Sequence, residues 1–224
     1  MIEENIKYII FDYGDVLVYP ITGNWFITTN FYDVINKDEF NLEKFNESVA
    51  KASSIISKKM MTEADEEKAF VEVYRTILNN LDLDLNVDSA AKKLAYDFVY
   101  SNNKHSLYSE VKENLERLSK KYKLLMLSDN WPCAHRLLKE WGISKYFEKV
   151  YISSEYEMQK KDKVFFDIPL KEFGINPKNV LFIDDKDYLL DIAKEKRMNV
   201  LLMDRDSNNK ASKHQIINSL IEIK

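Results

Sequence analysis

The first apolar run of this chain is the sequence feature that most constrains its fold. Residues 7–11 are apolar and largely β-branched or aromatic after Lys7, and the run stops at Asp12, with Gly14 two residues later. A continuous apolar run is typical of a strand buried on both faces of a parallel sheet. Open α/β sheets bind ligands just beyond the carboxyl ends of such strands. Asp12 is therefore a candidate functional residue, although an aspartate at a strand end is often only a turn former or a helix cap.

From about residue 103 onward, apolar strands alternate with helical patterns. We expect strands at 123–127, 149–152, 179–183 and 199–203, helices at 110–121, 132–141, 164–173 and 188–196, and a last short helix at 215–223. A polar loop is expected over 204–213. This alternation is the signature of βαβ units. It predicts a three-layer α/β fold with a doubly wound parallel sheet.

Residues 19–102 have a different pattern, with essentially no strand-like apolar runs. Amphipathic helical patterns cover 41–57, 62–80 and 88–100, and Asp88 and Ser89 offer an N-cap for the last of these. We interpret this stretch as a helical insertion after the first strand. The predicted division is an α/β core domain formed by residues 1–18 and 103–224, and a helical domain formed by residues 19–102.

Composition excludes several classes of protein. A chain of 224 residues can bury one good core and carry one smaller appendage. Its formal charge of −4 argues against a nucleic-acid partner, because that would need clustered positive charge. No apolar run is long enough to span a membrane and no secretion signal is apparent, so we expect a cytoplasmic protein with no membrane partner. The single cysteine, Cys133, excludes an intramolecular disulfide.

Polar residues end four of the expected strands, and in a parallel sheet these ends lie along one edge. The segments around them resemble the four ordered motifs of the haloacid dehalogenase-like (HAD) hydrolases, and the helical insertion lies where that family has its C1-type cap. The four segments are Phe11-Asp12-x-Gly14-x-Val16, Leu127-Ser128-x-Asn130, Ser154-Glu155 followed by Lys160 and Asp162, and Phe182-Ile183-Asp184-Asp185. The resemblance covers nearly the whole chain and implies a Rossmann-like core.

The resemblance also implies a reaction. Asp12 would attack phosphorus and form an acyl-phosphate, which divides hydrolysis into two displacements. The attacking carboxylate and the phosphate are both anionic, so a divalent cation is needed, and Mg²⁺ suits oxygen ligands. The implied metal ligands are Asp12, the Gly14 carbonyl, Asp184 and Asp185. The implied phosphate-binding residues are Ser128, Asp129, Asn130 and Lys160, of which Ser128 and Lys160 would also take part in catalysis.

Each of these residues also has a structural interpretation. Ser128 could cap the helix that begins near Pro132, and Lys160 could be a solvated lysine in a charged loop. The acidic pair could open a helix, where carboxylates favour the positive end of the dipole. The three histidines, His105, His135 and His214, show no spacing that suggests a metal site. We expect Trp131 and Trp141 to be packing residues.

One position departs from the family pattern. HAD phosphatases usually carry a second aspartate two residues after the nucleophile, as the general acid and base, and this chain has Gly14 there and Asp15 one place later. Side chains alternate in direction along a strand, so we expect Asp15 to point away from Asp12 unless the turn reorients it. Proton transfer by a placed group is worth roughly 100- to 10,000-fold. Its loss would slow turnover or restrict the enzyme to good leaving groups.

Three functions remain open from the sequence. The first is a Mg²⁺-dependent phosphomonoesterase that acts on a small phosphorylated metabolite. The second is a metal-independent haloacid dehalogenase, which typically has an aromatic residue at the position of Gly14. The third is a catalytically degenerate member that binds a ligand or partner through the same pocket. The substrate and the oligomeric state are not apparent from the sequence.

Overall fold

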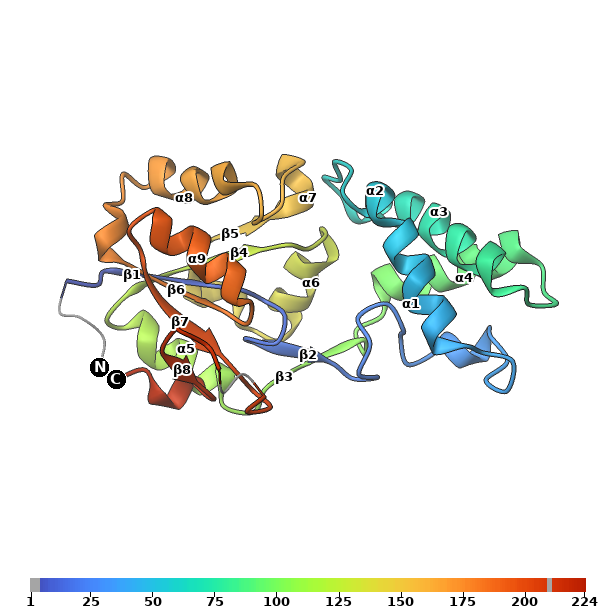
Figure 1. Cartoon of the computed structure of the whole chain (residues 1–224), viewed down its shortest axis with the longest axis horizontal. Helices are drawn as coiled ribbons and strands as arrows, with labels where there is room; N and C mark the ends of the chain where they lie inside the picture. Colours follow the sequence, from blue (N-terminus) through green and yellow to red (C-terminus); the bar gives the residue numbers. More distant parts are fainter. Residues whose placement is uncertain (1–4, 209–210) are drawn as a thin grey trace.

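The centre of the protein is a six-stranded sheet in which all neighbouring strands are parallel (Figure 1). The computed structural model describes residues 5–208 and 211–224. The strand order is β5-β4-β1-β6-β7-β8. The strands are β1 (Tyr8–Phe11), β4 (Lys123–Ser128), β5 (Phe147–Ile152), β6 (Val180–Asp184), β7 (Asn199–Met203) and β8 (Ile216–Ile217). The predicted parallel Rossmann-like sheet is confirmed, with β1 at its middle.

Helices cover both faces of the sheet, because the strand side chains alternate. In β1, Ile9 and Phe11 pack on the face covered by α5 (Val111–Ser119) and α6 (Cys133–Glu140), while Ile10 packs on the opposite face. That opposite face is covered by α8 (Asp167–Glu172) and α9 (Asp187–Glu195). On the two faces of β1, Ile9, Ile10 and Phe11 are therefore completely buried. This burial is the reason for the continuous apolar run in the sequence.

Helix boundaries differ from the predicted ones where local caps and turns decide them. The helix predicted over 41–57 is two helices, α1 (Leu42–Lys51) and α2 (Ser53–Ile56). The predicted N-cap at Asp88 or Ser89 is wrong, because the Asn86 side chain accepts a hydrogen bond from the Ser89 N–H and starts α4 (Val87–Tyr100). Pro169 does not kink a helix, because it lies in the first turn of α8, where its missing N–H has no helical partner.

The C-terminal segment does not form the helix predicted over 215–223. It contains β8 and a short 3₁₀ turn, Leu220–Glu222. The β7 edge offers unpaired backbone groups, and the Leu202 N–H donates to the Gln215 carbonyl at 2.9 Å. Strand pairing therefore overrides the local helical pattern. Of the predicted polar loop over 204–213, residues 209–210 lie outside the described residues, as do residues 1–4 of the predicted core domain.

Four helices form a separate unit beside the sheet (Figure 1). This helical unit consists of α1, α2, α3 (Glu63–Leu81) and α4, and it has a hydrophobic core of its own. Aromatic rings dominate that core, with Phe70 and Phe98 stacked at a centroid distance of 4.1 Å. The capping box of Thr62 and Asp65 fixes the start of α3. Among the described residues, no helix is both long enough and apolar enough to cross a membrane.

A two-stranded antiparallel ribbon connects the helical unit to the sheet. It pairs β2 (Val18–Pro20) with β3 (His105–Leu107), so the chain leaves and re-enters the α/β core along adjacent strands. This ribbon was not predicted, because each strand has only three residues and the two strands are far apart in the chain. The ribbon places His105 close to the end of β1, where the Tyr13 hydroxyl lies 3.1 Å from His105 Nδ1.

The loop between β4 and α6, the start of α6 and the start of α7 (Ser153–Tyr156) contact the helical unit directly. The indole N–H of Trp131 donates to the Ile56 carbonyl at 3.1 Å, and the Met60 N–H donates to the Ser154 carbonyl at 3.0 Å. The Cys133 N–H donates to Glu66 Oε2 at 2.7 Å. Glu66 is fully buried, and burial raises the pKa of its carboxyl against the opposing effect of Lys104. These bonds hold the helical unit against the end of the sheet that carries Asp12.

We expect Glu66→Ala to lower the free energy of unfolding by about 1–3 kcal/mol, because the buried Cys133 N–H loses its acceptor. Glu66→Gln retains an acceptor oxygen and should cost less. Urea unfolding of the purified variants measures both. The control is Glu43→Ala, on the exposed side of α1, which should change stability by no more than about 0.5 kcal/mol. Equal stabilities for Glu66→Ala and Glu43→Ala would contradict this account of the contact.

Candidate active site

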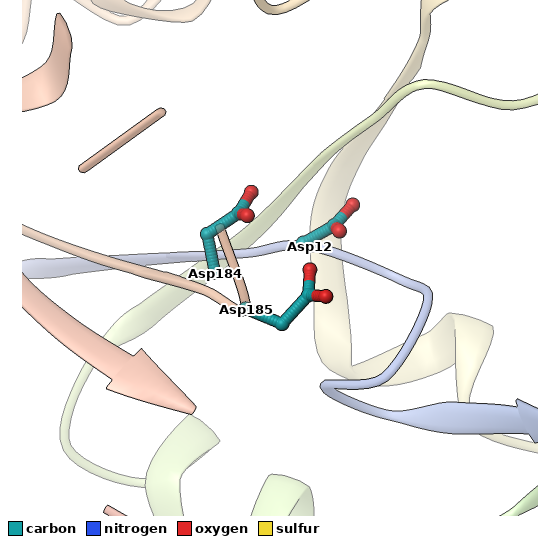
Figure 2. A group of neighbouring side chains, drawn as sticks. All are labelled: Asp12, Asp184 and Asp185. Atoms are coloured by element: carbon teal, nitrogen blue, oxygen red, sulfur yellow. The ribbon is translucent and has the colours of Figure 1, made fainter. Parts of the chain in front are cut away.

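Neighbouring parallel strands bring three carboxylates together at one edge of the sheet. Phe11 in β1 pairs with Ile183 in β6, and the Asp12 N–H donates to the Ile183 carbonyl at 2.9 Å. Asp184 and Asp185 follow directly. One carboxylate oxygen from each of Asp12, Asp184 and Asp185 lies within 4.8 Å of the others. Figure 2 shows the three side chains leaving these two adjoining segments.

A buried lysine neutralises part of this charge. Lys160 Nζ lies 2.8 Å from Asp12 Oδ1 and 2.6 Å from Asp184 Oδ2, and its side chain is only 3% exposed. Burial alone would lower the pKa of Lys160, but Asp12 and Asp184 outweigh it and hold that pKa above its usual range. Lys160 is therefore a charged site residue and not the solvated lysine that its charged loop also allowed.

Two lysines face the acidic pair, since Lys160 contacts Asp184 and Lys186 Nζ lies 2.5 Å from Asp185 Oδ2. Burial raises the pKa of Asp184 to about 8 against the opposing effect of Lys160, and Asp12 and Asp185 raise it further. Burial and the Asp12 carboxylate also raise the pKa of Asp185 against the opposing effect of Lys186. A divalent cation would offset this repulsion. Three oxygen ligands from two strand ends fit a hard cation such as Mg²⁺, which keeps several waters in its coordination shell.

The segment after β4 lies beside these carboxylates. Ser128, Asp129 and Asn130 line the same cavity as Asp12. Asp129 Oδ1 accepts a hydrogen bond from the Lys160 N–H at 2.8 Å, and this contact fixes the lysine loop against the end of β4. Asn130 is held by its backbone, since its N–H donates to Ser153 Oγ at 3.1 Å. The structure thus brings Asp12, Ser128, Lys160 and the Asp184–Asp185 pair together, one group from each of the four sequence segments. Glu155 does not join them, because it pairs with His135 at 2.7 Å.

Gly14 has an unexpected neighbour. Its φ is not in the left-handed region that favours glycine, so backbone conformation does not explain it. Instead, a Cβ added there would lie 3.1 Å from two ring carbons of Trp25. The indole of Trp25, in the segment between β2 and α1, therefore occupies the space into which a side chain at position 14 would extend.

Asp15, and not Gly14, has a positive φ, of 53°. The expectation from strand alternation does not apply to it, because β1 ends at Phe11 and the following turn redirects the chain. Asp15 lines the same cavity as Asp12. Burial raises the pKa of its carboxyl to about 6, and Asp185 contributes further. The Asp15 carboxyl therefore lies close enough to the acidic cluster for the negative charge of that cluster to raise its pKa.

The cavity beyond Asp12 has a volume of about 300 Å³, and aromatic side chains form part of its lining. Trp25, Phe26 and Trp131 line it, together with His105. Trp131 also packs on Phe70 in the core of the helical unit, at a ring distance of 5.0 Å, so its predicted packing role is confirmed. Sequence reasoning missed Trp25, Phe26 and His105. Nothing in their local spacing points to the site, because tertiary contacts bring them there.

Comparison with known proteins identifies the family. A model of the haloacid dehalogenase-like hydrolases matches residues 6–192. The chain belongs to the haloacid dehalogenase-like hydrolases, as its four sequence segments predicted. No curated protein matches it closely.

Solved structures share the fold over nearly the whole chain. A 2-haloacid dehalogenase from Pseudomonas syringae pv. tomato superimposes with a TM-score of 0.68 at 16% identity, covering 97% of this chain and 96% of the other. The L-2-haloacid dehalogenase from Xanthobacter autotrophicus, with chloropropionic acid covalently bound, gives 0.70 at 14% identity, with the same coverage. A HAD family enzyme from Bacteroides thetaiotaomicron, in complex with magnesium and inorganic phosphate, gives 0.60 at 20%, covering 92% and 98%. At these identities the likeness shows the fold alone.

The contact between Gly14 and Trp25 predicts that the effect of Gly14→Ala on stability reverses its sign when the Trp25 indole is removed. Gly14→Ala should lower the free energy of unfolding by about 1 kcal/mol, because its Cβ overpacks against the indole. In a Trp25→Ala background the same substitution should stabilise by about 0.4–1 kcal/mol, since alanine restricts the unfolded chain and the φ is permitted. Urea unfolding of the four proteins in this cycle measures the coupling. Additive effects would mean that the indole does not restrict position 14.

Proposed function

We propose that this hydrolase is a Mg²⁺-dependent phosphomonoesterase that acts on a small phosphorylated metabolite, with Asp12 as the nucleophile. The observation that carries the proposal is the cluster of Asp12, Asp184 and Asp185, whose ligand atoms lie within 4.8 Å of one another. A dehalogenase of this family needs the nucleophile but no metal, and so has no need of a buried acidic pair. The raised pKa of Asp184 indicates that this pair costs free energy when no cation is bound.

In the proposed reaction, Asp12 Oδ attacks phosphorus as the bond to the leaving oxygen breaks, and a water then hydrolyses the aspartyl-phosphate. Lys160 holds Asp12 in place at 2.8 Å and keeps positive charge beside it throughout. Ser128, the Asp129 amide and Asn130 would bind the phosphate oxygens. Mg²⁺, held by Asp12, the Gly14 carbonyl, Asp184 and Asp185, would offset the repulsion between nucleophile and phosphate.

Proton transfer is the step for which this site offers the fewest suitable side chains. Gly14 has no side chain, and Asp15 is the carboxylic acid in the cavity whose pKa, raised by burial to about 6, suits exchange with water. We propose that Asp15 assists the attacking water. The helical unit would serve as a C1-type cap, formed by residues 19–102. The cytoplasmic location and the lack of a nucleic-acid or membrane partner stay predictions from the sequence.

Haloacid dehalogenation is the second candidate. The observation in its favour is that an aromatic ring, Trp25, covers Gly14, where dehalogenases of this family typically carry an aromatic residue. The surrounding lining of Phe26 and Trp131 would also suit an apolar haloacid. Two of the similar structures are of haloacid dehalogenases.

A parallel assay distinguishes the two functions. The purified protein is incubated with a panel of phosphorylated metabolites and with 2-haloacids, each with Mg²⁺ and with a chelator. We expect phosphate release that requires Mg²⁺ and that falls to background in Asp12→Asn, which removes the attacking charge at constant size. Halide release that is insensitive to the chelator would instead establish the dehalogenase. No turnover of either class would support a binding protein.

Mg²⁺ should also stabilise the protein without any substrate. At a concentration 100 times its Kd, a ligand of the native state adds about 2.7 kcal/mol, which is ~5–10 °C in Tm for a chain of this size. Asp185→Asn should abolish this response, because it removes one of the three carboxylates. Asp84→Asn, exposed on the helical unit, is the matched control and should respond like the unmodified protein. A Tm that is unaffected by Mg²⁺ in the unmodified protein would rule out the metal site.

A further inference from the structure

The cavity beside Asp12 contains a buried polar atom that the proposed chemistry does not use. His105 is only 7% exposed, lines the cavity, and its Nε2 has no hydrogen-bond partner among the described residues. Buried polar atoms are nearly always hydrogen-bonded, and an exception calls for a partner that binds there. Burial lowers the pKa of the imidazole to about 3, so the ring is neutral at physiological pH.

The hydrogen bond at the other nitrogen decides what Nε2 can offer. The Tyr13 hydroxyl lies 3.1 Å from Nδ1, and a tyrosine hydroxyl keeps its hydrogen at neutral pH. No other acceptor for that hydroxyl is found among the described residues. The hydroxyl therefore donates to Nδ1, and the neutral ring carries its own hydrogen on Nε2. Nε2 is thus an unpaired donor that calls for an acceptor.

Aromatic side chains line the cavity beside this histidine. The Trp25 ring contacts the imidazole edge to face, at a centroid distance of 4.9 Å, and Phe26 and Trp131 complete the aromatic lining. The volume of about 300 Å³ lies at the lower end of the ordinary range for ligand pockets, roughly 300–1,000 Å³. That space suits one ring with a phosphate, and a flat ring gains most from aromatic walls because it can stack or pack edge to face.

The Trp25 indole also affects how the leaving oxygen can be protonated. A Cβ at position 14 would lie 3.1 Å from Trp25, so the ring covers the place where an acid for the leaving group would extend. Without that acid, the leaving oxygen must depart largely unprotonated. Phenols and related hydroxylated rings leave far more readily in this form than simple alcohols do. The residue that removes the acid is therefore one that would bind an aromatic leaving group.

We propose that the substrate is the phosphate monoester of a single flat aromatic or heteroaromatic ring, and that the ring packs on Trp25 and accepts a hydrogen bond from His105 Nε2. This inference rests on the proposed phosphomonoesterase function and names its substrate class. His105 and Trp25 are specificity residues in this account. The reaction remains hydrolysis, in which water supplies the proton to the departing aryl oxide and the hydroxyl that ends on phosphate.

The first test separates ring binding from leaving-group acidity. We compare kcat/KM for phenyl phosphate with that for a fluorinated alkyl phosphate whose alcohol is as acidic as phenol, in the presence of Mg²⁺. Aromatic contacts should favour the phenyl ester by roughly tenfold. Trp25→Leu should remove most of this preference, whereas Tyr96→Leu, an exposed ring on α4, should leave it unchanged. Equal kcat/KM values for the two esters in the unmodified protein would overturn the proposal.

The second test uses binding, so it does not depend on turnover. Phenylphosphonate should bind roughly tenfold more tightly than methylphosphonate, as measured by calorimetry with Mg²⁺ present. Among the three isomers of pyridylphosphonate, one should bind roughly 3- to 10-fold more tightly than phenylphosphonate, because its ring nitrogen accepts the Nε2 hydrogen. His105→Asn retains an acceptor near the Nδ1 position but lacks Nε2, so it should abolish this difference. His105→Gln places an amide near the Nε2 position and should retain part of it.

The two tests fail in different ways. If no phosphate ester is hydrolysed but the phosphonates bind in the expected order, the proposed hydrolysis is wrong and the aromatic pocket stands. If alkyl and aryl esters are hydrolysed equally and both phosphonates bind equally, the phosphomonoesterase stands and the substrate class is wrong. Equal binding of the pyridyl isomers and phenylphosphonate would overturn the role of His105.

Discussion

A buried ammonium group between two buried carboxylates is the interaction on which the rest of the site depends. Lys160 Nζ joins Asp12 to Asp184 at 2.8 and 2.6 Å. Three negative charges at adjacent strand ends would repel one another without it, and the penalty for burying each charge would be larger. Lys160 fixes Asp12 and balances part of its charge, and Lys186 pairs with Asp185, yet the pKa values of Asp184 and Asp185 stay raised. The geometry of the cluster follows from this partial compensation.

The second constraint is the close approach of the helical unit to the sheet edge. Glu66 on α3 accepts the first N–H of α6, and Trp131 reaches from the end of β4 to the Ile56 carbonyl. These contacts bring aromatic rings over a site that is otherwise charged. The result is a small cavity whose lining combines carboxylates, a lysine and a serine with aromatic side chains.

Much of the α/β core could be predicted from sequence because the apolar patterns of its strands and helices match their burial in the folded protein. The strands β1, β4, β6 and β7 are apolar on both faces, and their apolar runs can be recognised without knowing their partners. The C-terminal segment 215–223 could not be predicted in this way. Its helical pattern is real, but the open edge of β7 offers backbone partners, and pairing of Ile216–Ile217 satisfies them.

The order of the four polar strand ends, the family and the candidate residues Asp12, Ser128, Lys160, Asp184 and Asp185 could all be read from the sequence. Each of these residues follows a recognisable strand or lies at a fixed distance from one, and parallel pairing necessarily brings strand ends to the same edge. The side chains that face them depend on tertiary contacts. Trp25 covers Gly14, and His105 pairs with Tyr13 across a separation of 92 residues. Such contacts depend on how the helical unit and its connecting ribbon fold back on the sheet. No local pattern encodes them, because the residues interact through space and not through the periodicity of a helix or strand.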